Sequence, residues 1–215
     1  MNNPNTKSIH TISQWDIAFA VLIPLSILIV NDPFSQVRVL TADACEYLNI
    51  ATNFAHGKGF NISYNVHLSF LTPYFSAFAF KAPLFPFFAA MLIAFKGIAA
   101  VYFFNLLLSS INGLLFYAIL RIKVQEWTAF LWTVFFTFSK SFIFAAFTPW
   151  SEQWHLCLIL LATVLFLQSS GREFLIGGIL ALAFLTRAAT IYNGAGFLIA
   201  VFFLHGINAD SLRRC

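Results

Sequence analysis

The sequence predicts an all-α fold, a polytopic membrane helical bundle of about six transmembrane helices. Three observations support this prediction. Of the 215 residues, 60% are hydrophobic and only 9% are charged, whereas a soluble domain is usually about 45–50% apolar and about 25% charged. The mean hydropathy is +0.82. Several separate apolar runs approach the roughly 20 residues that a helix needs to cross the hydrocarbon of a bilayer.

Six apolar runs are candidate spans, separated by short polar connections. They cover residues 15–30, 98–120, 127–147, 154–168, 174–186 and 191–205. Lys140 interrupts the third run, and the last three are short. Short spans are tolerated where neighbouring helices satisfy their ends. A further apolar run, 83–95, is brief and contains Pro86, so we expect an interfacial or re-entrant segment there.

The basic residues of the connections predict the orientation. Arg121 and Lys123 lie in one short turn, Arg172 lies in the next, and Arg213 and Arg214 end the chain. Cytoplasmic loops are enriched in Lys and Arg, so these connections and both termini are expected in the cytoplasm. The net charge of +4 is therefore no signal for nucleic-acid binding. The predicted parts are a cytoplasmic tail 1–14, a transmembrane module 15–205 that includes an extracytoplasmic loop 31–97, and a cytoplasmic tail 206–215.

The most polar stretch of the chain lies in that loop and predicts an amphipathic helix. Asp43, Glu46 and Tyr47 are spaced i, i+3 and i+4, and apolar residues continue the same face. Thr41 is a candidate N-cap, and the Gly-Lys-Gly sequence at 57–59 is a candidate stop. The two acids are expected either to complement the helix dipole or to act on a ligand at the membrane surface.

Three more charged residues are expected on the same, extracytoplasmic side. Lys81 precedes the proline-broken segment, where it either snorkels or meets an anionic head group or phosphate. Glu152 begins a span, where a carboxylate also suits a helix N-terminus. Arg187 lies between two apolar runs. A charge at membrane depth costs about 2.5–3.5 kcal/mol on insertion scales, so Arg187 needs an anionic partner, for which Glu152, Asp43 and a substrate phosphate are the candidates.

Several short motifs occur in one order along the chain. They are DACEY at 43–47, IA at 50–51, GKGF at 57–60, KAPLFP at 81–86, Asn105 in the following run, SE at 151–152 and LTR at 185–187. With these motifs the chain resembles the N-terminal module of the GT-C glycosyltransferases that use polyprenyl-phosphate sugars, the protein O-mannosyltransferase and aminoarabinose-transferase group. The resemblance covers about residues 10 to 205. Ala82 departs from it, because many members have a second proline there. Members also usually have many more spans, and often a soluble C-terminal domain.

The resemblance implies an enzyme that transfers a sugar from a polyprenyl-phosphate donor to an acceptor hydroxyl, with inversion, on the extracytoplasmic face. Asp43 matches the catalytic base. Glu46, Tyr47, Lys81, Glu152 and Arg187 would bind the substrates, with Lys81 and Arg187 facing the phosphate. The chain lacks the DxD motif of nucleotide-sugar enzymes, so no cofactor is required, although an acid pair could hold a divalent metal in some relatives.

The implied partners are the lipid-linked sugar, a hydroxyl acceptor on protein, lipid or glycan, and the bilayer itself. A second polypeptide supplying the missing C-terminal half is a further expected partner. The implied location is a multi-pass protein of the plasma or inner membrane, or of the endoplasmic reticulum, whose active face is periplasmic, extracellular or luminal. Two alternatives stay open: a transporter or flippase of lipid-linked sugars, and an inactive truncated fragment of a glycosyltransferase.

Overall fold

The computed structural model describes residues 13–16, 18, 19, 22, 26, 41–62, 77–78, 81–168, 172–188 and 190–205. Over these residues the chain is all-α apart from one pair of two-residue antiparallel strands. The helices are α2 (Ala42–Ala55), α3 (Leu84–Lys96), α4 (Ile98–Arg121), α5 (Glu126–Thr137), α6 (Lys140–Phe147), α7 (Glu152–Gln168), α8 (Glu173–Thr186) and α9 (Thr190–His205). The strands are β1 (Asn61–Ile62) and β2 (Ala77–Phe78). The expected tail 206–215 and most of the expected tail 1–14 and span 15–30 lie outside the described residues.

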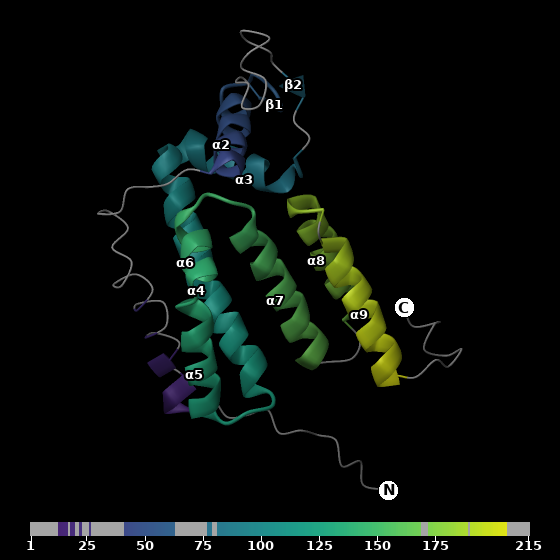
Figure 1. Ribbon diagram of the computed structural model, residues 1–215. Coiled ribbons are helices and arrows are strands. Elements are labelled where there is room, and N and C mark those ends of the chain that lie inside the picture. Colours follow the sequence, from purple (N-terminus) through teal and green to yellow (C-terminus); the bar gives the residue numbers. More distant parts are fainter. Residues whose placement is uncertain are drawn as a thin grey trace, which may run out of the picture.

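The helices α2 and α3 lie together at one end of the molecule, above the longer bundle formed by α4 to α9 (Figure 1). The chain turns from α3 into α4 at Gly97, whose φ of +75° suits a residue without a side chain. The helix α3 runs across the end of the bundle, whereas α4 runs along its length (Figure 1). The helix α3 occupies the stretch for which the sequence predicted an interfacial or re-entrant segment.

One hydrophobic cluster fixes α2 on this end of the bundle. Tyr47 and Ala51 of α2 pack with Phe85 and Ala89 of α3 and with Val101 of α4, and all five are buried. The ring of Phe85 meets that of Tyr47 edge-on, with centroids 5.1 Å apart, a favoured geometry for aromatic pairs. Since a well-packed aromatic core holds its side chains in single rotamers, α2 presents its first turn in a defined position.

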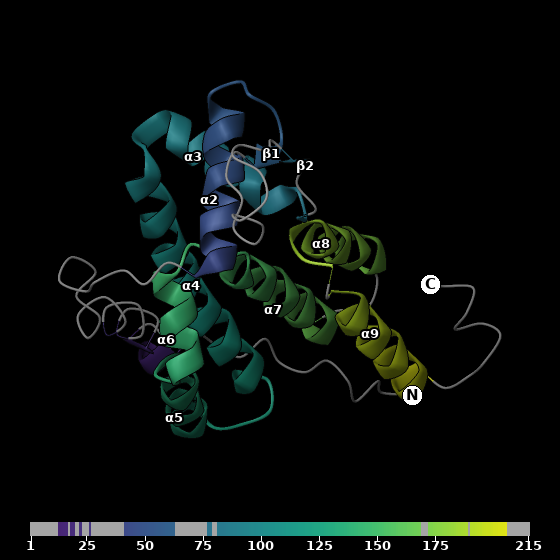
Figure 2. The ribbon, with the colours of Figure 1, turned by 45° about the horizontal axis from the view of Figure 1, so that its top comes forward.

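The helix α7 lies between the group α4 to α6 and the pair α8 and α9 in both views (Figures 1 and 2). In the part of the chain that the structure describes, α4, with 24 residues, is long and apolar enough to cross a membrane by itself. The apolar helices α3, α7 and α8 are shorter than 18 residues. The bundle of helices is therefore confirmed, whereas the six transmembrane spans stay a prediction.

The span expected over 127–147, which Lys140 interrupts in the sequence, is broken in the structure into α5 and α6. The two helices would pass together as one span, but they are bent by 61°. The side-chain oxygen of Thr137 turns back to bond the carbonyls of Thr133 and Val134 near the end of α5. Ser139 then caps α6 by accepting from the amide of Phe142. Such local bonds compete with the helix ladder and favour its interruption.

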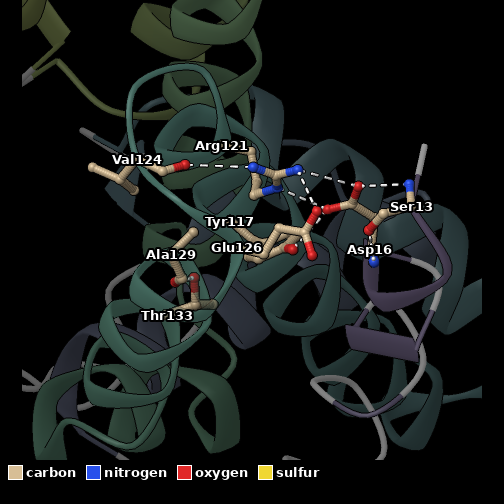
Figure 3. A network of polar contacts seen from close by, with 8 residues as sticks. All are labelled: Ser13, Asp16, Tyr117, Arg121, Val124, Glu126, Ala129 and Thr133. Carbon is tan, nitrogen blue, oxygen red and sulfur yellow. Dashed lines mark hydrogen bonds and ion pairs between the residues drawn. The ribbon is translucent and has the colours of Figure 1, made fainter. Parts of the chain in front are cut away.

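A polar network ties the described N-terminal residues to the far end of α4 (Figure 3). The carboxylate of Asp16 accepts from Arg121 Nε at 2.8 Å and from the Tyr117 hydroxyl at 2.7 Å. Arg121 also pairs with Glu126 at 3.1 Å. Ser13 and Asp16 cap each other's backbone amides. The start of the expected first span is thereby held at the end of the bundle away from α2.

Candidate functional site

The candidate site begins at the N-terminus of α2, where the sequence predicted a helix. Thr41 is the N-cap, and its Oγ1 accepts from the amide of Ala44 at 3.3 Å. The same oxygen accepts from Nε1 of Trp150 at 2.5 Å. The helix ends before Gly57 and Gly59, whose φ values are +73° and +79°. The cap and the stop predicted from the sequence are therefore both present, and Trp150 joins the cap to the α6–α7 connection.

Lys81 bridges the two acids on the first turns of α2. Its Nζ lies 2.8 Å from Asp43 Oδ1 and 2.9 Å from Glu46 Oε2, and 5.4 Å from the centre of the Tyr47 ring. The side chain of Asp43 is 60% exposed, whereas that of Glu46 is 15% exposed. Burial alone would lower the pKa of Lys81, but the hydrogen bonds to Asp43 and Glu46 outweigh it and raise the pKa above 10.5.

Tyr47 connects this acidic turn to the α6–α7 connection. Its side chain is buried, and its hydroxyl lies 3.2 Å from Oγ of Ser151, which donates to it. Burial is the main cause that raises the pKa of Tyr47 above 10, helped by the negative charges of Glu152 and Asp43. Tyr47 therefore stays neutral at physiological pH and serves as a hydrogen-bonding contact.

Arg187 follows the last turn of α8 and pairs with Glu152 at the start of α7. One oxygen of Glu152 contacts the guanidinium, and the other, Oε2, is buried without a hydrogen-bond partner in the described part of the chain. The sequence left three partners open for Arg187, and the structure selects Glu152. His155, one turn further into α7, contacts Thr190 and Asn193 of α9, each at 3.1 Å.

All six residues that the sequence singled out lie along one chain of contacts. Lys81 contacts Asp43, Glu46 and Tyr47; Tyr47 contacts Ser151; and its neighbour Glu152 contacts Arg187. Three carboxylates thus share two cations, and Asp43 is the most exposed of the three. All three carboxylates are paired with a cation, but the side chain of Asp43 is open enough to solvent for an incoming group to reach it, whereas Glu46 and Glu152 are more covered.

Comparison with family models, curated proteins and solved structures gives no significant match. The geometry of the chain itself therefore carries the functional argument. Within the described residues, no group of three or more His, Cys, Asp or Glu side chains is arranged to hold a metal ion.

Sequence reasoning missed the residues that hold the α6–α7 connection in place. The sequence placed Asn105 in a span without a contact, and it did not single out Asn112. Both are buried in α4 and donate their side-chain amides to residues 145–153. A usable signal existed, since two asparagines seven residues apart lie on one face of an apolar helix. Nothing in the sequence indicates the bond from Trp150 to Thr41, because it joins residues 109 positions apart.

Proposed function

We propose that this chain is a membrane glycosyltransferase, or its N-terminal module, that transfers a sugar from a polyprenyl-phosphate donor to an acceptor hydroxyl on the extracytoplasmic face. In this proposal the chain is a GT-C-like bundle of about six spans. The observation that carries the proposal is the arrangement at the start of α2. An exposed carboxylate, Asp43, stands beside the cation of Lys81 on α2, which packs with α3 and α4, and α4 is long and apolar enough to cross a bilayer.

In the proposed reaction Asp43 is the general base. Its carboxylate takes the proton of the acceptor hydroxyl as that oxygen attacks the anomeric carbon of the sugar. The bond from the anomeric carbon to the phosphate oxygen breaks, and its electron pair leaves with the polyprenyl phosphate. The configuration at the anomeric carbon is thereby inverted. General-base catalysis of this kind contributes about 10²–10⁴-fold in rate. Asp43 then releases the proton to water, which the exposure of its side chain favours.

The two cations are proposed to stabilise the departing lipid phosphate, since negative charge develops there in the transition state. Lys81 is anchored by the less exposed Glu46, so it can turn its remaining donors from Asp43 to a phosphate oxygen while keeping the Glu46 contact. Arg187 is 43% exposed, and its guanidinium has more donors than its bond to Glu152 uses among the described residues. Tyr47 and Glu152 complete the substrate-binding surface.

The test is sugar transfer by the chain reconstituted in nanodiscs. Radiolabelled polyprenyl-phosphate mannose and aminoarabinose serve as donors, with a mixture of hydroxyl-bearing membrane acceptors. Asp43→Asn is expected to lower transfer by about 10²–10⁴-fold while donor binding changes by less than about threefold. Glu173→Gln is the matched control, because Glu173 is an exposed acid in the first turn of α8.

The outcomes separate the alternatives. Equal transfer by the wild-type chain and Asp43→Asn would refute the role of Asp43. Donor binding without transfer in the wild-type chain would refute activity of this chain by itself. Movement of labelled lipid-linked sugar across the bilayer without transfer would instead support a transporter.

A further inference from the structure

The connection from α6 to α7, residues 148–151, and the first residue of α7 are the part of the molecule where the parts of the candidate site meet. Trp150 bonds the N-cap Thr41, and the neighbouring Ser151 bonds Tyr47. Glu152 then pairs with Arg187. The contacts that hold this connection in place therefore determine the position of α2 relative to the Glu152–Arg187 pair.

Backbone bonds hold only part of the connection: the amide of Thr148 bonds the carbonyl of Phe144, and the amide of Trp150 bonds that of Thr148. The helix α6 ends at Phe147, and Pro149 follows two residues later. A helix end leaves its last carbonyls without intrahelical partners, and proline supplies no N–H to satisfy them. In an apolar environment such carbonyls must find another donor.

Asn105 of α4 supplies that donor. Its side-chain amide Nδ2 lies 2.8 Å from the carbonyl of Ala145, 3.1 Å from that of Ala146 and 2.8 Å from that of Thr148. The residue is 1% exposed. One amide thus bonds both the last turn of α6 and the first residue of the connection.

The side-chain oxygen of Asn105 gains no hydrogen bond in this position within the described residues. Asn105 Oδ1 is buried without a partner in the described residues, and an unsatisfied buried acceptor is unfavourable. Among the described residues only the donor half of the side chain is used, and its bonds go to the last turn of α6 and to the first residue of the connection. Asn112 lies seven residues further along α4 and donates to the backbone carbonyl and the side-chain oxygen of Gln153.

We infer that Asn105 is a positioning residue. By bonding the end of α6 from the neighbouring helix, it fixes the 148–151 connection so that Ser151 meets Tyr47 and Glu152, at the start of α7, meets Arg187. Its importance for catalysis rests on the proposed function, whereas its effect on the position of the connection does not.

The test is hydrogen exchange of backbone amides in nanodiscs, comparing Asn105→Leu with the wild-type chain. Leucine has a similar shape and removes the amide together with its unsatisfied oxygen. Exchange of the amides from 150 to 155 is expected to accelerate at least about tenfold, because the variant loses both N–H donors with which Asn105 bonds the end of α6 and Thr148. The amides of α5 and of the second half of α7 are expected to stay within about twofold.

Ser110→Ala is the matched control. Ser110 is buried in the same helix, and within the described part of the chain its hydroxyl bonds the carbonyl of Leu106 in α4 and no residue of the connection, so exchange from 150 to 155 should remain as in the wild-type chain. If Asn105→Leu does not fold, Asn105→Ser, which keeps one donor, is measured instead and should show the same local pattern.

Unchanged exchange from 150 to 155 would overturn the inference. Equal acceleration throughout the chain would also overturn it, since that pattern indicates a general structural role. Sugar transfer measured on the same samples separates the two proposals. If the wild-type chain transfers no sugar, the proposed function fails for this chain, and the exchange result still decides whether Asn105 positions the connection.

Discussion

Lys81 contacts two acids at nearly the same distance, and burial predicts that it depends on them unequally. The Asp43 partner is 60% exposed and the Glu46 partner is 15% exposed, while Lys81 itself is 25% exposed. An exposed pair is worth at most about 1 kcal/mol, because water and salt screen it. A hydrogen bond to a charged group in a less exposed setting is worth about 1.5–3 kcal/mol.

The expected coupling energies are therefore about 0.5 kcal/mol for Lys81 with Asp43 and about 1.5 kcal/mol for Lys81 with Glu46. The difference of about 1 kcal/mol corresponds to about fivefold in an equilibrium constant. The assay is a pair of double-mutant cycles built from Lys81→Met, Asp43→Asn and Glu46→Gln. The opening free energy of α2 is measured by hydrogen exchange of its amides in nanodiscs.

Lys96→Met is the matched control, because Lys96 ends α3 and its ammonium lies 5.5 Å from the centre of the Phe95 ring. It should leave the opening of α2 unchanged. A coupling to Asp43 equal to or larger than that to Glu46 would refute the reasoning. Asp43 would then be a structural partner of Lys81, and its availability as a base would lose its physical support.

Three further predictions concern the other charged contacts. Arg187→Met should destabilise the chain by about 1–2 kcal/mol, less than the roughly 3–5 kcal/mol for a fully buried pair, because both partners are partly exposed. Adding Glu152→Gln should restore most of this stability in thermal unfolding. A double variant as unstable as the single one would contradict the pairing. The pKa of Lys81 is raised above 10.5 by folding, so the stability that Lys81 contributes is fully present below pH 10.5 and is lost as the pH rises through the raised pKa. The difference in unfolding temperature between the wild-type chain and Lys81→Met should therefore be constant from pH 7 to 10. A decline in that range would refute the raised pKa of Lys81. Asp16→Asn should cost about 1–2 kcal/mol in unfolding free energy, since Asp16 accepts from both Arg121 and Tyr117, whereas Glu126→Gln should cost less because Glu126 makes one longer contact.

The sequence predicted those parts of the molecule that local chemistry determines. The cap at Thr41, the helix through Tyr47 and the glycine stop follow from residues close together in the chain, and the structure has all three. The need of Arg187 for an anionic partner followed from the cost of a charge in an apolar run, although three partners remained open until the fold selected Glu152.

The remaining features depend on contacts between distant residues. The sequence indicated an interruption at Lys140 but not the bend between α5 and α6, because hydrophobicity continues on both sides while the bonds of Thr137 and Ser139 end one helix and start another. The role of Asn105 was equally hidden, since its partners lie about 40 residues further along the chain. A buried asparagine needs hydrogen-bond partners, but only the fold shows which residues these are.

The helix α4 has a consequence for the lipid in which the molecule would work. Its 24 residues span about 36 Å, while a typical hydrocarbon layer is about 30 Å thick. The Asp16–Arg121 network holds one end of α4, and at the other end α3, joined through Gly97, packs against α2, which contains the acidic turn. In a bilayer, α4 would tilt as a rigid helix in response to hydrophobic mismatch. The height of Asp43 above the head groups would then follow the acyl-chain length of the host lipids.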